Sequence, residues 1–383
     1  MTRPGDIGVV GIGMVSSIGH DVNTSCASAR AGITRPSGFA RYEVRDSREA
    51  EPEALTVHAV DTLTYGFSGR ARLLRLLVAA IEDVLAQYPD KPWLSARVGV
   101  FISLPSWART MTGALRIQNP TIREALEQQA RETTVQDDLQ RAQNLLRDAG
   151  EIAQWGVPLA ADRVFVSGTT GTAEAVQNAS AELGRGTIEM AIVVAVDSWI
   201  DVSTAGWLEK TARLKTPDQP VGLQPGEAAA VVILETQRRS RQRGAVLLGV
   251  VDAAYFAQEQ RFLLRAEVST GRVTAELLDR LRSLAGWSEH VAPWIITDQN
   301  GEADRASEWG NTLYHLVAQD ALYHDCLLWY PALSFGDTGS ASGGVAICMA
   351  LRSFARNYAP HNAVVIANSS DGPGRSVMLI RRA

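Results

Sequence analysis

The stretch Gln224-Pro-Gly-Glu-Ala-Ala-Ala-Val-Val-Ile-Leu-Glu235 is the part of this chain that says most about its fold. Residues 228–234 are wholly apolar and follow a Pro-Gly turn, which is typical of a buried β-strand. Other short, mostly apolar runs occur before and after this stretch and predict further strands. They cover residues 7–12, 97–103, 164–166, 190–196, 245–251, 294–297, 327–330 and 364–368.

Helical patterns separate these runs. Residues 70–88 carry leucine, isoleucine and valine at helical spacing, and helices are also predicted at 172–183, 275–285 and 343–357. Continuous apolar strands that alternate with helices predict a sheet covered on both faces. Because residues 1–240 and 241–383 have similar content, we expect a duplicated α/β architecture. The basic run from Gln237 to Gly244 is interpreted as a helix end that connects the two halves.

Composition narrows the function classes. The 383 residues carry a net charge of -5, which argues against a general nucleic-acid binder. No apolar run is long enough to span a membrane, and the first residues lack a signal-peptide pattern, so a cytoplasmic protein is expected. The three cysteines, Cys26, Cys326 and Cys348, are too scattered for a disulfide framework or a zinc site. We therefore expect neither a metal nor a cofactor.

Several segments, in sequence order, resemble the β-ketoacyl synthases, a family with a thiolase-like fold. The segment quoted above is similar to the family's "GEGA" strand, and Ser167-Gly-Thr-Thr-Gly-Thr172 stands where the family has its nucleophile turn. The other similar segments are residues 9–19, 21–38, 182–197, 297–302, 334–343 and 368–374. The resemblance implies duplicated halves in five layers, α/β/α/β/α, with a poorly matching helical insertion at about 105–155.

The same resemblance implies that the condensing cysteine is missing. A condensing synthase needs a thiolate at a helix N-terminus, where the helix dipole lowers the pKa of the thiol and backbone amides stabilise the oxyanion. The corresponding position here is Gly168, and the nearest cysteines are Cys26 and Cys326. A glycine tolerates the strained backbone of such a turn, so the turn can persist without its chemistry.

The other catalytic positions of the family have also changed. Its two histidines, which stabilise an enolate oxygen, correspond to Asn300 and Asp337, and its lysine corresponds to Ala332. An aspartate would repel the enolate, whereas a histidine donates a hydrogen bond to it. The aromatic gate loop becomes Ser370-Asp-Gly-Pro373. Condensing activity is therefore not expected.

Two alternatives assign a role to the remaining polar residues. Ser167, Thr169 or Thr170 could act as a hydroxyl nucleophile in acyl transfer or hydrolysis, although the turn is not the Gly-x-Ser-x-Gly elbow and no histidine has an obvious path to it. Pocket residues are expected to converge near the former active site, where acids could bind a cation or an amine, or simply cap turns. They are Glu227, Asp298, Glu302, Ser370 and Asp371.

These observations predict a pseudo-synthase with a structural, scaffold or adaptor role. Proteins of this fold pair two subunits, so we expect a homodimer, or a heterodimer with an active ketosynthase-like subunit as chain-length factors form. The charged helical stretch from Thr121 to Trp155 is a candidate partner surface, and an ordinary solvated helix pair is the other interpretation.

Overall fold

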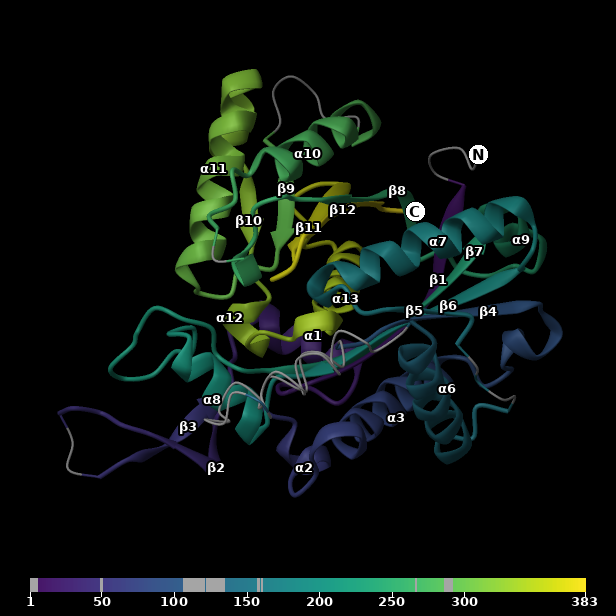
Figure 1. Cartoon of the computed structure of the whole chain (residues 1–383). Helices are drawn as coiled ribbons and strands as arrows, with labels where there is room; N and C mark the ends of the chain where they lie inside the picture. The colour runs from purple at the N-terminus through teal and green to yellow at the C-terminus, as the bar shows by residue number, and fades with distance from the viewer. Residues whose placement is uncertain are drawn as a thin grey trace.

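The computed structural model describes residues 6–48, 51–105, 121, 135–156, 159, 161–265, 267–285 and 292–383. Ten of the strands in this part of the chain form one sheet with the order β10-β9-β11-β12-β8-β1-β7-β6-β4-β5 (Figure 1). The strands therefore fall into two sets of five, one before and one after the short helix α9 (Gln237–Gln242).

The first set comprises β1 (Ile7–Ser16), β4 (Val98–Ser103), β5 (Arg163–Phe165), β6 (Met190–Ser198) and β7 (Glu227–Thr236). The second comprises β8 (Gly249–Gln258), β9 (Trp294–Thr297), β10 (Leu327–Trp329), β11 (Ala363–Ser369) and β12 (Gly374–Arg381). In each set, counted in sequence order, the third, second and fourth strands lie side by side in that order and are parallel. The fifth strand pairs antiparallel with the fourth, and the first strand pairs antiparallel with the fifth. The two sets therefore repeat one topology, and β1 joins them by pairing antiparallel with β8.

Alternate residues of these strands face different helix layers. In β4, Phe101 faces the central core with helices α7 (Gly171–Arg185) and α13 (Ser342–Ala355). Ile102 faces the outer layer with α3 (Gly69–Gln87) and α6 (Val135–Ile152). The other outer layer, α10 (Arg272–Ala285) and α11 (Ala303–Gln319), packs on the second set. This gives five layers, as predicted.

Smaller elements surround the layers. The helices are α1 (Val22–Arg30), α2 (Asp61–Thr64), α8 (Val202–Lys210) and α12 (Ala332–Phe335). The hairpin of β2 (Ser37–Val44) and β3 (Glu53–Val57) extends away from the layers (Figure 1). Short 3₁₀ turns lie at Pro92–Ser95, Gly168–Thr170, Leu263–Arg265, Ala321–Asp325 and Gly339–Ala341.

Most predicted elements are observed with small shifts at their ends, and the differences have physical causes. The strand predicted at 245–251 begins at Gly249 and runs to Gln258, because its later residues pair with β12. The apolar-run criterion missed β12, which contains Arg375 and Ser376 yet is buried. Of the predicted helical insertion, α6 is observed, and residues 106–120 and 122–134 lie outside the described part of the chain. None of the described helices combines the length and apolarity that crossing a membrane requires.

Candidate functional site

The turn between β5 and α7 is the centre of the candidate site. Gly168 has φ +66°, a left-handed conformation that glycine adopts at little cost, and the chain then enters the first turn of α7. A β-carbon at this position would lie 3.1 Å from Ser370 Oγ, so the turn faces the loop that follows β11. The backbone therefore forms a strand–turn–helix elbow, although no thiol stands in it.

A cavity of about 450 Å³ opens beside this turn. Trp199, Trp207 and Phe256 contribute aromatic surface, and the loop from Ser370 to Gly374 closes one side. Its remaining lining residues are Pro105, Val166, Ser167, Gly168, Thr169, Glu174, Gln258, Leu264, Arg305, Gly339 and Ser340. The cavity is large enough for a small organic ligand.

Asn300 and Asp337, the two positions expected to correspond to the family's histidines, are in direct contact. Asn300 Nδ2 donates hydrogen bonds to Asp337 Oδ2 at 2.6 Å and to Glu302 Oε2 at 2.7 Å. The Gly339 amide donates to Asp337 Oδ1 at 2.7 Å. Burial raises the pKa of the Asp337 carboxyl, against the opposing effect of the Arg305 charge. This position therefore holds a buried acid that is already hydrogen-bonded.

Two arginines join these acids into one buried ion cluster. Arg213 lies 2.5 Å from Glu302 and 3.0 Å from Asp371, and Arg305 lies 3.1 Å from Asp371. Arg305 also contacts Asp298 at 3.0 Å, while the Ser369 amide donates to the same carboxylate at 2.8 Å. Sequence reasoning missed both arginines, although several acids expected in one buried site imply cationic partners.

The structure brings most of the predicted pocket residues together. Ser370 and Asp371 line the cavity, and Asp298 and Glu302 stand behind Arg305. Ala332 lies at the start of α12, in the segment that leads to Asp337.

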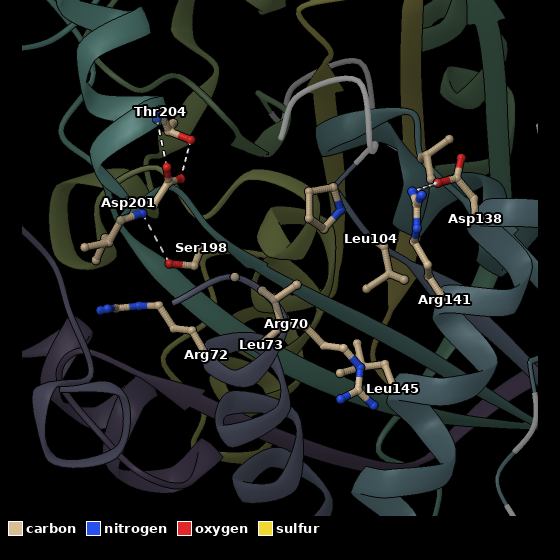
Figure 2. Close-up of a pocket in the computed structure, with 14 residues that line it drawn as sticks. Arg70, Arg72, Leu73, Leu104, Asp138, Arg141, Leu145, Ser198, Asp201 and Thr204 are labelled. Atoms are coloured by element: carbon tan, nitrogen blue, oxygen red, sulfur yellow. Dashed lines mark hydrogen bonds and ion pairs between the residues drawn. The ribbon is translucent and has the colours of Figure 1, made fainter. Parts of the chain in front are cut away.

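Glu227 lies elsewhere. It pairs with Arg72 at 2.5 Å and accepts hydrogen bonds from the Val60 amide and the Thr64 hydroxyl. Arg72 lines a second cavity of about 390 Å³ between α3, α6 and α8 (Figure 2). Leu73, Leu104 and Leu145 give that cavity an apolar wall. Pro105 and Val166 line both cavities, so Glu227 supports a cavity next to the elbow rather than the elbow cavity itself.

The hydroxyls at the elbow have a carboxyl neighbour that sequence reasoning missed. Glu174, in the first turn of α7, accepts hydrogen bonds from Ser167 and Thr170, and burial raises its pKa. The Ser167 carbonyl, 3.0 Å from Thr170 Oγ1, is an alternative acceptor for the single proton of that hydroxyl. Ser167 and Thr170 stand seven and four residues before Glu174, not at the three-residue spacing of a capping box, so no local motif indicates this contact. No histidine of the described residues lines the cavity.

The cysteines lie away from the elbow. Cys26 and Cys348 are buried in the central core, where burial raises the pKa of the Cys26 thiol to about 12. Burial also raises the pKa of Cys326, which directly precedes β10. Within the described part of the chain, no group of three histidine, cysteine or acidic side chains is arranged to hold a metal ion.

Comparison with known proteins identifies the fold. No family model matches the chain, and no curated protein matches its sequence. Among solved structures, a chain of "AntDE:AntF (apo): type II PKS acyl-carrier protein in complex with its ketosynthase bound to the hexaketide" has a TM-score of 0.70 at 14% identity, with 100% of both chains covered. The ishigamide ketosynthase/chain length factor has a TM-score of 0.65 at 16% identity, with 99% of both chains covered.

A third structure is a larger protein. The PfaC keto synthase-chain length factor has a TM-score of 0.69 at 12% identity, with 99% of this chain and 48% of that chain covered. Together with the repeated topology and five layers, these similarities establish that the chain has the thiolase-like fold of ketosynthases and chain length factors.

Proposed function

We propose that this chain is a ketosynthase-like protein without condensing activity, which acts as a structural or interaction subunit. The observation that carries the proposal is the ion cluster of Arg213 and Arg305 with Asp298, Glu302 and Asp371. By the resemblance, Asn300 and Asp337 beside this cluster correspond to the positions where a condensing enzyme has hydrogen-bond donors for an enolate, and here those positions adjoin buried acids instead.

The elbow supports the same proposal. An acyl-enzyme requires a nucleophile at the start of the helix, and Gly168 offers none. The Cys26 and Cys348 thiols are buried and their raised pKa values disfavour the thiolate. Both carboxylate oxygens of Asp337 already accept hydrogen bonds, from Asn300 and from the Gly339 amide. Asp337 therefore does not replace a histidine that donates a hydrogen bond to a developing oxyanion.

A chain length factor-like subunit is the second candidate, and a specific observation favours it. Two of the similar solved structures are named as a ketosynthase with a chain length factor. A subunit of that kind pairs with an active ketosynthase, so we propose a dimer, either of two copies of this chain or with a cysteine-bearing partner. Helix α6 and its neighbourhood remain the proposed contact surface for other proteins.

Intact-protein mass spectrometry with acyl-thioester donors tests the loss of catalysis. We expect no acyl adduct on the wild-type chain. A Gly168→Cys variant is the matched positive control, because it returns a thiol to the start of α7. If only this variant is labelled, the missing nucleophile explains why the wild-type chain is not acylated. An adduct on Ser167, Thr169 or Thr170 of the wild type would contradict the proposal and indicate a hydroxyl nucleophile.

Native mass spectrometry separates the two kinds of subunit. The purified chain alone should give a homodimer if it is a scaffold. Coexpression with a cysteine-bearing ketosynthase should give a mixed dimer if it is a chain length factor-like subunit. A stable monomer under both conditions would contradict both candidates.

A further inference from the structure

The elbow cavity has an aromatic wall, and the ion cluster contacts one part of it, since the Arg213 guanidinium lies 5.0 Å from the centroid of the Trp207 ring. Trp199 and Trp207 are nearly parallel, with an interplanar angle of 6° and ring centroids 6.5 Å apart. Phe256, from β8, lines the same cavity. In contrast, Trp93 and Trp155 in the outer core stack on one another at 3.9 Å. The wall therefore offers aromatic surface to whatever occupies the cavity.

Besides Arg305 Nε, which lies 3.7 Å from Glu302, three buried oxygen atoms around this cavity have no hydrogen-bond partner among the described residues. They are Thr169 Oγ1, Ser340 Oγ and Glu174 Oε1, and all three residues line the cavity. Ser340 is fully buried, yet its backbone is engaged, since its amide donates to Asp197 at 2.7 Å and its carbonyl accepts from Ser103 at 3.1 Å. An unpaired buried hydroxyl destabilises the fold, so a ligand that pairs with it is favoured.

The charges of the cavity limit the class of ligand. Arg305 is surrounded by Asp298, Glu302 and Asp371, so its positive charge is already compensated. Glu174 adds a further carboxyl whose raised pKa reflects its burial. An anionic ligand would have to compete with these acids for Arg305, whereas a neutral hydroxyl group can donate to Glu174 and exchange hydrogen bonds with the two side-chain hydroxyls.

We propose that this cavity binds, without covalent chemistry, a flat and uncharged aromatic molecule that carries hydroxyl groups. The ring packs against Trp199, Trp207 and Phe256, and its hydroxyls pair with Ser340, Thr169 and Glu174. This binding site goes beyond the proposed interaction role and does not depend on it, because a subunit or a scaffold can hold such a ligand equally well.

Calorimetric titration of the full chain tests the site with three probes: 2,7-dihydroxynaphthalene, naphthalene-2-sulfonate and tetradecanoate. The first should bind with one site per chain, and the sulfonate and the fatty acid should bind at least tenfold more weakly. Ser340→Ala and Thr169→Val each remove one unpaired hydroxyl and should lower the affinity for dihydroxynaphthalene by about threefold to tenfold. Phe256→Leu should weaken the binding of the ring itself.

Ser376→Ala is the matched control. Ser376 Oγ is also buried without a partner, but the residue lies on β12 and does not line the cavity. All three hydroxyl deletions should leave the melting temperature unchanged or higher, because each removes an unpaired buried group. Only the two cavity variants should lose affinity. Equal affinity in all variants, stronger binding of tetradecanoate, or no binding of dihydroxynaphthalene would overturn the proposal.

Discussion

Arg305 shows, for a single residue, how the buried charges of this site are compensated. Its side chain is 8% exposed and lies among Asp298, Glu302 and Asp371. Replacing it by methionine, Arg305→Met, would leave those carboxylates buried with only Arg213 to balance them. Breaking a buried pair in this way costs about 3–5 kcal/mol of unfolding free energy. Urea denaturation followed by circular dichroism should measure this loss.

An exposed pair provides the control for that variant. Arg48 bonds Asp46 through its guanidinium at 2.7 Å, and its side chain is 72% exposed. Arg48→Met should therefore change the free energy of unfolding by less than about 1 kcal/mol. A loss at Arg305 no larger than the loss at Arg48 would contradict the view that the cluster is an integral part of the fold.

Glu174 should make the stability of the protein depend on pH. Burial raises its folded-state pKa, so the folded protein holds this proton more tightly than the unfolded chain does. As the pH rises from the unfolded-state pKa through the folded-state pKa, the Glu174 carboxyl ionises and the free energy of unfolding decreases. Below the unfolded-state pKa the carboxyl is protonated in both states and has no such effect. Glu174→Gln removes the titration, and glutamine still accepts hydrogen bonds from Ser167 and Thr170. The variant should gain melting temperature over wild type at pH 8 but not at pH 4. An equal difference at both pH values would contradict this assignment.

At the scale of elements, the central layer depends on a close contact between α7 and α13. A β-carbon on Gly343 would lie 2.7 Å from Thr172 Cβ, which is shorter than any ordinary contact. Gly343→Ala should therefore force the two helices apart and cost about 1–3 kcal/mol, measured by thermal and urea denaturation.

Gly310 is the matched control on another helix. It lies within α11, and a β-carbon there would meet no atom within 4 Å. Gly310→Ala should stabilise the protein by about 0.5–1 kcal/mol through helix propensity. Similar losses for both variants would show that the helix contact is not the reason for the effect at Gly343.

The sequence predicted strands well where apolar residues fill the whole strand. Strands such as β6 and β7 are continuous apolar runs because both faces of the sheet are covered. β12 was missed because its buried arginine, Arg375, is compensated by Glu308 from α11, at a sequence distance that no local pattern contains. Element patterns therefore identify the sheet but not the strands whose polar residues find distant partners.

At the scale of the whole molecule, the shared central layer predicts a single unfolding transition. Residues from strands on both sides of α9 belong to one core cluster with α7 and α13. A fragment that ends at residue 244 would expose the α7 face that packs against β8 and α13. We expect the full chain to unfold in one calorimetric transition and the fragment to lack near-ultraviolet circular dichroism. Two separate transitions, or a folded fragment, would contradict this view.

The fold class and the elbow were predictable from the sequence, because apolar strands alternate with helices and the similar segments stand in the family's order. Residue identity alone shows that position 168 holds glycine and not cysteine. That Asn300 and Asp337 correspond to two family histidines stays a prediction from the resemblance. The three-dimensional structure was needed to show how the acids of the site are compensated, that Glu227 pairs with Arg72 beside the neighbouring cavity, and that Glu174 reaches Ser167. Those facts depend on which buried charges meet across distant segments, and burial makes such pairing energetically necessary without encoding the partners locally.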